Sequence, residues 1–217
     1  MLPLRIDTLT FGLASENTYV LSTSNGKACI VDPGCSSAQE EEQLLQLIHN
    51  LGCTPTLCLC THRHFDHVHG CHFVNQVWGL TPLLSDIEIN IMPSLQEQLQ
   101  WFGLPSTPPA PEPEYQPLCA PYAPLSWEAY TLYPLLVPGH SPGHLVFHIP
   151  QAQLVLAGDT LFAGGIGRTD LWGGNHHDLV THIHNVLFRL PPNTVVYSGH
   201  GPSTTIGEEI RTNPFLK

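Results

Sequence analysis

The chain has 217 residues, 42% of them hydrophobic, and a net charge of −11 with only 7 Lys plus Arg. This length and apolar content are typical of a globular protein with a sizeable core, and we predict one domain over residues 1–217. So few cations argue against nucleic acid or a membrane surface as a partner, and no run of about 18 apolar residues is present to span a bilayer.

The seven cysteines are an odd number, and no basic and apolar signal region precedes them. Such a chain is typical of a protein with reduced thiols, and we expect a cytoplasmic location. The oligomeric state has no signal in the sequence and stays open.

The N-terminal part of the chain predicts a hairpin, a helix and a further strand. Asn25-Gly26 lies between two apolar runs, which is the strongest short signal for a hairpin turn. Ser37 and Glu40 have the spacing of a capping box that begins a helix, and Gly52 ends it. The strands expected here are 17–23, 27–31 and the short buried run 56–60.

Prolines divide the middle of the chain. Pro93 disturbs a helix expected within 86–102, and residues 105–124 carry 8 of the 21 prolines. We predict that 105–124 is an irregular connection inside one domain and contains no regular element. The other expected elements are a helix that ends at Gly79, strands at 81–84, 130–137, 145–149, 154–156 and 194–197, and a helix from Asn175 to Pro191.

A histidine-rich stretch, 62–67, follows the strand at 56–60 and contains four candidate metal ligands. With 14 His in 217 residues, chance would produce such a cluster in roughly two of a thousand chains of this composition. In extended backbone His62 and His64 point the same way, while Arg63 between them points away. The turn that follows would direct Asp66 and His67 to a second point nearby.

Three further strand ends each supply one ligand-type residue, and the combined set fits two adjacent ions. Two such ions lower the pKa of a shared water to about 7, which makes a bridging hydroxide the nucleophile, with Asp66 and Asp159 as the carboxylates at the reaction centre. Imidazole and carboxylate ligands indicate Zn²⁺, with Fe or Mn as alternatives. One ion would bind His62, His64 and His140, the other would bind Asp66, His67 and His200, and Asp159 would bridge them.

The stretch 139–143 matches G-x-S-x-G, the nucleophile motif of serine hydrolases, but it lacks features that this motif needs for catalysis. The oxyanion hole of that motif needs the N–H of the residue after the serine, and Pro142 has none. A strand rather than a helix is expected next, so Ser141 is interpreted as a turn residue. His144 and Asp32 are expected to orient ligands, and His69 to turn away from the site on its helix.

Taken together, these motifs resemble the metallo-β-lactamase superfamily, and within it the short glyoxalase-II-type hydroxyacylglutathione hydrolases. The resemblance implies an α/β (α+β) fold, an αβ/βα four-layer sandwich of two mixed β-sheets with helices outside. It also implies a metal-dependent hydrolase of thioesters such as S-lactoylglutathione. The matching motifs are Thr-His62-x-His64-x-Asp66-His67, Pro-Gly-His140-Ser-Pro-Gly-His, Gly-Asp159-Thr-Leu-Phe, Gly-His200-Gly, Gly164-Gly-Ile-Gly-Arg168-Thr-Asp170-Leu and Thr204-Thr-Ile-Gly.

Glyoxalase II enzymes also carry a helical domain with basic glutathione-binding residues, which these 217 residues do not match, so thioester hydrolysis is the broader expectation. One alternative is a persulfide dioxygenase with a single Fe(II) on His62, His140 and Asp159. Another is a non-catalytic protein whose metals hold loops together. Arg168 is the candidate for binding a carboxylate of the small-molecule substrate, and the competing interpretation is a salt bridge with Asp170 or Asp32.

Overall fold

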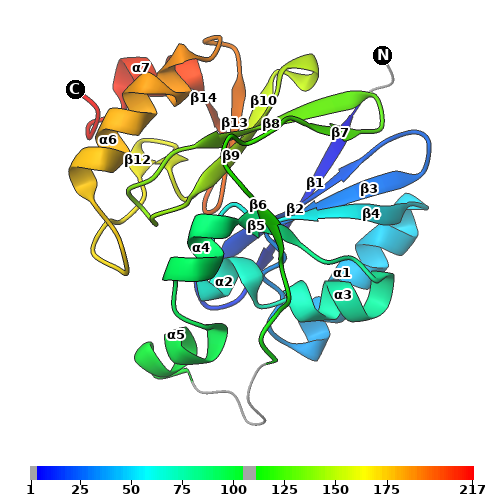
Figure 1. Cartoon of the computed structure of the whole chain (residues 1–217). Coiled ribbons are helices and arrows are strands. Elements are labelled where there is room, and N and C mark those ends of the chain that lie inside the picture. The colour runs from blue at the N-terminus through cyan, green and yellow to red at the C-terminus, as the bar shows by residue number, and fades with distance from the viewer. Residues whose placement is uncertain (1–3, 105–110) are drawn as a thin grey trace.

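Two six-stranded β-sheets face each other and carry helices on their outer sides (Figure 1). The structure is a computed structural model that describes residues 4–104 and 111–217. The first sheet has the order β1 (Arg5–Phe11), β2 (Glu16–Ser22), β3 (Lys27–Val31), β4 (Thr54–Leu59), β5 (Leu83–Ser85), β6 (Gln116–Leu118). The second has the order β14 (Thr204–Thr205), β13 (Val195–Ser198), β10 (Leu154–Gly158), β9 (Leu145–Ile149), β8 (Tyr130–Leu136), β7 (Leu125–Trp127).

Both sheets are mixed. In the first, β1, β2 and β3 pair antiparallel, and β3 to β6 pair parallel. In the second, only β10 and β13 pair parallel among the described strands. The short strands β11 (Leu161–Phe162) and β12 (Gly165–Ile166) form a separate hairpin. The helices are α1 (Ala38–Leu51), α2 (Phe65–Val68), α3 (Cys71–Trp78), α4 (Asp86–Ile91), α5 (Leu95–Trp101), α6 (His176–Asn185) and α7 (Ile206–Thr212).

Alternation of side chains along the strands builds three apolar layers. Between the sheets, Leu21 of β2 packs in the same cluster as Leu145 and Phe147 of β9. On the outer face of the first sheet, α1 packs Leu44 and Ile48 against the opposite side of β2 and β3. The second sheet is covered by α6 in the same way. Each fully buried side chain of this kind stabilises the fold by about 1.5–3 kcal/mol.

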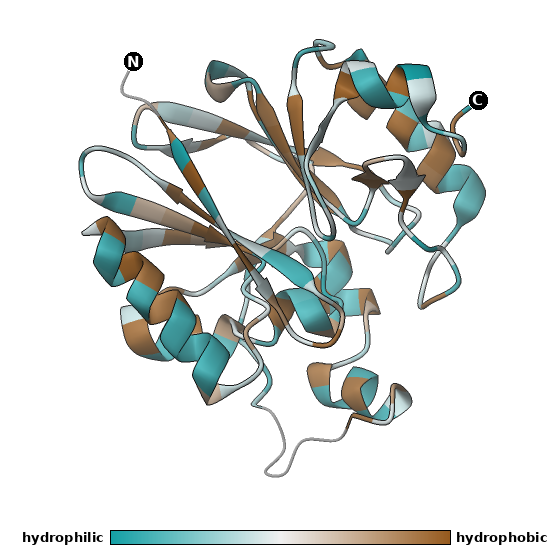
Figure 2. Ribbon diagram, turned by 180° about the vertical axis from the view of Figure 1, so that it is seen from behind, coloured by the Kyte–Doolittle hydropathy of each residue, from teal (hydrophilic) through white to brown (hydrophobic). Residues whose placement is uncertain are grey.

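These layers form a four-layer αβ/βα sandwich, which confirms the predicted class of fold. Figure 2 shows hydrophobic segments in the strands of both sheets and α1 with one hydrophobic and one hydrophilic side. Among the described residues, no helix has the length and apolar character needed to cross a membrane.

The predicted hairpin and first helix are confirmed, with one correction at the helix start. β2 and β3 pair around Gly26, whose φ is +71°. The Ser37 hydroxyl accepts from the N–H of Glu40, but the Glu40 carboxylate does not accept from the Ser37 N–H, as a capping box would require. It accepts instead from Ser36 N–H at 2.7 Å and from Gly12 N–H at 2.8 Å. The carboxylate therefore fastens the β1–β2 turn to the helix instead of closing a capping box.

The proline-rich segment is only partly irregular. Its residues 105–110 lie outside the described part of the chain, and 116–118 form β6, so the prediction of no regular element is wrong there. Pro117 is tolerated because β6 is an edge strand, where a missing N–H leaves no partner unpaired. Pro93 separates α4 from α5 as expected. The last long helix ends at Asn185, earlier than predicted, and continues as a 3₁₀ turn at Leu187–Arg189.

The two sheets meet at the edge where β3, β4, β10 and β13 end. Gly199 N–H donates to the Gly158 carbonyl at 2.8 Å, and Asn17 N–H donates to the Gly199 carbonyl at 2.7 Å. Leu145 N–H donates to the Thr61 carbonyl at 2.8 Å, which ties the second sheet to the loop after β4. These bonds bring residues from both halves of the chain to one point.

Candidate metal centre

The histidine-rich stretch bends at His64. This residue is the N-cap of α2 in extended backbone, with φ −68° and ψ 145°. Asp66 and His67 follow in the single turn of α2. The change from extended to helical backbone produces the turn that the sequence predicted between the two pairs of ligands.

Three imidazole rings form the first group of candidate ligands. His64 Nδ1 lies 2.8 Å from His140 Nε2, which lies 3.2 Å from His62 Nε2. All three side chains are buried. His62 and His64 come from the loop after β4 and His140 from the loop after β8, so the group joins the two sheets.

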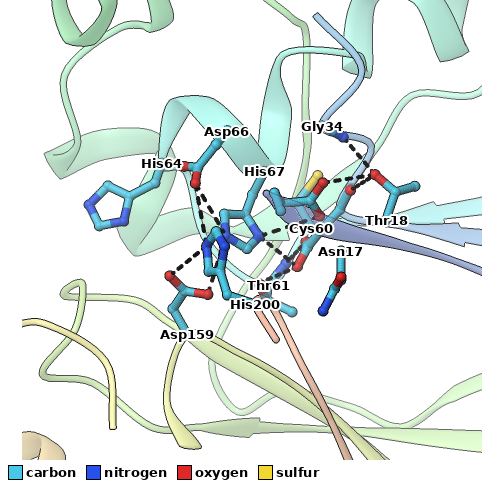
Figure 3. Close-up of polar contacts among 12 residues, drawn as sticks. Asn17, Thr18, Gly34, Cys60, Thr61, His64, Asp66, His67, Asp159 and His200 are labelled. Atoms are coloured by element: carbon cyan, nitrogen blue, oxygen red, sulfur yellow. Dashed lines mark hydrogen bonds and ion pairs between the residues drawn. The ribbon is translucent and has the colours of Figure 1, made fainter. Parts of the chain in front are cut away.

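The second group combines the Asp66 carboxylate with the rings of His67 and His200, and Figure 3 shows it together with Asp159 and His64. Asp66 Oδ2 lies 3.4 Å from His200 Nε2 and 4.0 Å from His67 Nε2. Asp159 Oδ1 lies 3.3 Å from His67 Nε2, and its Oδ2 lies 3.3 Å from His200 Nε2 and 3.6 Å from His140 Nε2. Asp159 therefore contacts both groups, and the structure brings all seven predicted residues together.

The hydrogen bonds of the rings fix which nitrogen faces the centre. Three rings place Nδ1 near an oxygen that only accepts: His140 with the Arg168 carbonyl at 2.7 Å, His200 with the Ala14 carbonyl at 3.0 Å and His67 with Asp32 Oδ2 at 3.1 Å. Each Nδ1 therefore carries the hydrogen, and a neutral ring presents a bare lone pair at Nε2.

When the rings are neutral, their Nε2 lone pairs and the carboxylate oxygens are acceptors that face one another. Among the described side chains, His67 Nε2 and Asp159 Oδ1 are buried atoms without a hydrogen-bond partner. A divalent cation satisfies such a set of converging acceptors, and imidazole with carboxylate is a donor set suited to Zn, Fe or Mn. The residues present thus fit divalent metal ions in both groups.

The electrostatics of the two groups differ. Burial lowers the pKa of His62 well below its ordinary value and that of His64 to about 3. Burial also lowers the pKa of His200, but hydrogen bonds to Asp159 and Asp66 outweigh it and raise the value to about 10. Burial raises the pKa of Asp159, yet His67 and His200 hold it well below its ordinary range. The first group is neutral, whereas the carboxylates of the second favour positive charge beside them.

Two further residues orient ligands, as the sequence predicted. Asp32 accepts from Thr61 N–H at 2.7 Å and from the Thr61 hydroxyl at 2.7 Å, and it also holds His67. His144 accepts from Asp159 N–H at 3.1 Å and stacks on His62 with ring centroids 4.7 Å apart. Gly199 also contributes, because a Cβ there would collide with Asp159 Oδ1.

Sequence reasoning missed the buried glutamate Glu88 of α4. Its Oε2 accepts from Arg63 N–H at 2.8 Å, and its Oε1 accepts from Gly143 N–H at 2.6 Å. One carboxylate therefore connects the loop of His62 and His64 to the loop of His140. Burial raises the pKa of Glu88, and the two backbone N–H groups oppose that rise.

Gln98 of α5 holds the same loop from a second helix. Its amide donates to the Arg63 carbonyl at 2.7 Å and accepts from Phe65 N–H at 2.9 Å. The Arg63 side chain points away from the ligands, as expected, and donates to the carbonyls of Ile89 and Met92 at 3.0 and 3.1 Å. Because these hydrogen bonds are made with backbone groups, no sequence motif predicts them.

A pocket of about 560 Å³ opens over the candidate ligands. Its walls include Phe102, Phe162 and Arg168. Arg168 makes a bidentate pair with Asp170, with Nε–Oδ1 2.7 Å and Nη2–Oδ2 2.8 Å. The salt bridge that was the competing interpretation of Arg168 is therefore formed. The two side chains are 55% and 69% exposed, and an exposed pair of this kind exchanges partners at little energetic cost.

Two expectations concern residues close to the ligands in sequence. Ser141 is fully buried, and Leu145–Ile149 after it is a strand, so the serine motif lacks the exposed turn and helix of a nucleophile elbow. His69 was predicted to turn away from the site, and among the described residues it belongs to none of the groups of candidate ligands and does not line the large pocket. It lines a small pocket beside Asp66 instead, after α2 ends at Val68 and before a separate helix begins at Cys71.

Residues 12–200 match the sequence model of the Metallo-beta-lactamase superfamily. The chain is 39% identical over 208 residues to the probable metallo-hydrolase YqgX of Bacillus subtilis, covering 94% of each. It is 33% identical over 216 residues to the hydroxyacylglutathione hydrolase GloC of Haemophilus influenzae, covering 93% of this chain and 92% of GloC.

Solved structures agree with these matches. BLEG-1 B3 metallo-beta-lactamase superposes with a TM-score of 0.86 at 33% identity over 98% of this chain and 100% of that one. TTHA1623 in a di-iron-bound form gives 0.82 at 35% identity over 97% and 100%. ETHE1 from Myxococcus xanthus gives 0.74 at 25% identity over 97% and 83%.

The fold and the cluster of His and Asp residues at the sheet edge are those of a metal-dependent hydrolase that uses divalent metal ions. The chain belongs to the metallo-beta-lactamase superfamily.

Proposed function

We propose that the protein hydrolyses thioesters, with S-acylglutathione such as S-lactoylglutathione as the candidate substrate. We also propose that it uses two divalent ions, with Zn²⁺ as the first candidate. The observation that carries the proposal is the position of Asp159, whose two oxygens contact the first and the second group of ligands. A residue so placed suits a bridge between two ions. When bound, such ions polarise a carbonyl oxygen and lower the pKa of water to about 7.

The chain's own residues hold this arrangement rigid. Asp32 fixes the ring of His67, the Arg168 carbonyl fixes that of His140, and the Ala14 carbonyl fixes that of His200. Partners of this kind keep the metal-binding nitrogen directed at the ion and typically change metal affinity by about 10–100-fold when removed.

The leaving group decides between thioesters and amides. Among the described residues that line the large pocket, every titratable side chain other than Arg168 is one of the seven candidate ligands. No free carboxylic acid or imidazole is therefore at hand there to protonate a leaving group. A thiolate, with a pKa near 8.5, leaves without a general acid, whereas an amine does not. This favours thioesters.

Arg168 is proposed to bind a carboxylate of the substrate. It is the one cation among the described lining residues of the large pocket, and its guanidinium reaches Asp170 in the bidentate geometry that a substrate carboxylate would also use. The similarity to GloC, a hydroxyacylglutathione hydrolase, supports the thioester and the glutathione part of the proposal.

A persulfide dioxygenase is the second candidate. His62, His140 and Asp159 form a face of two histidines and one carboxylate, with His140 Nε2 3.2 Å from His62 Nε2 and 3.6 Å from Asp159 Oδ2. Such a face suits mononuclear Fe(II). The di-iron form of TTHA1623 indicates that iron is compatible with this fold.

A parallel assay separates the two candidates. Protein loaded with Zn²⁺ or with Fe²⁺ would be given S-lactoylglutathione with thiol release followed, and glutathione persulfide with oxygen uptake followed. The proposal expects thiol release that a chelator abolishes and no oxygen uptake above the protein-free control. Oxygen uptake by the Fe²⁺ form without thiol release by either form would replace the proposal with the dioxygenase.

A further inference from the structure

A second, smaller cavity opens beside Asp66 and has no role in the function described so far. Its volume is about 150 Å³, against about 560 Å³ for the large pocket. Both cavities are lined by Leu13, Ala14, Phe65 and Asp66. Because Asp66 is a candidate ligand of the second group, the two cavities adjoin each other at that side of the candidate metal centre.

The walls of the small cavity are mostly apolar. Phe65, Leu99 and Leu104 line it with apolar side chains, and Gly12 and Gly34 add backbone without side chains. Leu99 and Leu104 belong to the apolar cluster under α5, so this wall is supported by packed side chains.

Few polar groups face into the small cavity. Its polar lining side chains are Ser36, His69 and the candidate ligand Asp66, and no Lys or Arg is among its described lining residues. The Ser36 hydroxyl is already bound to Glu40 at 2.9 Å. An anionic group of a substrate would meet no Lys or Arg among the described lining residues, whereas an apolar group would lose only its contact with water.

Size assigns the two halves of a thioester to the two cavities. A cavity of about 150 Å³ holds a molecule the size of benzene, so the small cavity takes a group of about six carbon atoms. A thiol carrier of the size of glutathione is too large for it and must lie in the large pocket beside Arg168. We propose that the small cavity binds the acyl group of the thioester, and that the enzyme prefers apolar acyl groups of up to about six carbons.

This inference rests on the proposed thioester hydrolysis and specifies its substrate class. Zn²⁺-loaded protein would be assayed on S-acylglutathiones with unbranched acyl groups of two to ten carbons, with S-lactoylglutathione alongside. Each methylene buried in the cavity should raise kcat/KM by about four-fold until the cavity is full near six carbons, after which kcat/KM falls. S-lactoylglutathione should be a poorer substrate than S-hexanoylglutathione.

Two variants at one position move the predicted optimum in opposite directions. Leu104 is half-buried and lines only the small cavity of the two. Leu104→Ala enlarges the cavity and should shift the optimum to longer acyl groups, and Leu104→Trp should shift it to shorter ones. Leu190→Ala and Leu190→Trp are matched controls, because Leu190 is also half-buried but packs in the cluster under α6. They should keep the wild-type optimum.

The outcomes separate the two proposals. Equal kcat/KM for all acyl lengths, or an optimum that both Leu104 variants leave in place, overturns the acyl-pocket assignment while thioester hydrolysis stands. Absence of hydrolysis with every thioester overturns both. If Leu104→Trp does not fold, the chain-length series and Leu104→Ala still decide the question.

Discussion

Glu88→Gln is the change that should reveal how the two ligand loops are held together. The substitution keeps the shape of the side chain but replaces one carboxylate oxygen by an NH₂ group. Only one of the N–H groups of Arg63 and Gly143, now 2.8 and 2.6 Å from carboxylate oxygens, can then be accepted. The other meets a second donor in a side-chain site that is 0% exposed.

The magnitude follows from these two losses. A hydrogen bond to a charged group contributes about 1.5–3 kcal/mol, and a buried N–H left unpaired costs about 1–3 kcal/mol. We therefore expect the free energy of unfolding to fall by about 3–5 kcal/mol, which for a chain of this size lowers Tm by about 6–20 °C. Metal affinity should fall by about 10–100-fold, because both loops that carry the first group of ligands depend on Glu88.

The assay pairs thermal melting of the Zn²⁺-loaded protein with competition against a chromogenic chelator. Glu42→Gln is the control, since Glu42 is exposed on α1 and undergoes the same chemical change. It should melt within about 2 °C of the wild type. If Glu88→Gln melts as high as the control and retains zinc against the chelator, the carboxylate does not hold the loops and the reasoning fails.

Three other substitutions test the roles of single residues. Asp159→Ala should lose metal from both groups and all hydrolysis, whereas His67→Ala mainly empties one; elemental analysis that finds two metals per chain in the Asp159 variant contradicts the bridge. Ser141→Ala should keep kcat within a few-fold, because the serine is buried and its motif lacks the elbow, and a loss of about 100-fold with metals retained would restore the nucleophile interpretation. Arg168→Ala should raise KM for S-lactoylglutathione at least about ten-fold at unchanged kcat and Tm. Asp170→Ala, which frees the arginine, should not raise KM, and a variant at Arg168 that melts much lower with KM unaltered would mark the residue as a loop brace.

Most of the site could be predicted because its residues follow directly after apolar strands. The strand at 54–59 ends just before His62, and Asp159 and His200 follow β10 and β13 at the same edge. Strand ends are visible in the sequence as the point where an apolar run gives way to glycine and polar residues. The alternation of side chains in extended backbone then paired His62 with His64, and the turn before the next helix paired Asp66 with His67.

The parts that could not be predicted depend on contacts with backbone. Glu88 and Gln98 sit in short helices where a polar residue normally faces solvent, yet both are buried because they bind N–H and carbonyl groups of the 62–65 loop. Their partners carry no side-chain signature. β6 was missed for a different reason, since proline is excluded from central strands but not from an edge.

The central claim is that two ions act together on a thioester. Its most direct test is a titration of metal-free protein with Zn²⁺, in which bound metal and hydrolysis of an S-acylglutathione are measured on the same samples. We predict that two equivalents bind per chain and that activity reaches its maximum only as the second one binds. Full hydrolysis at one equivalent, with no further change at two, would contradict the two-ion site.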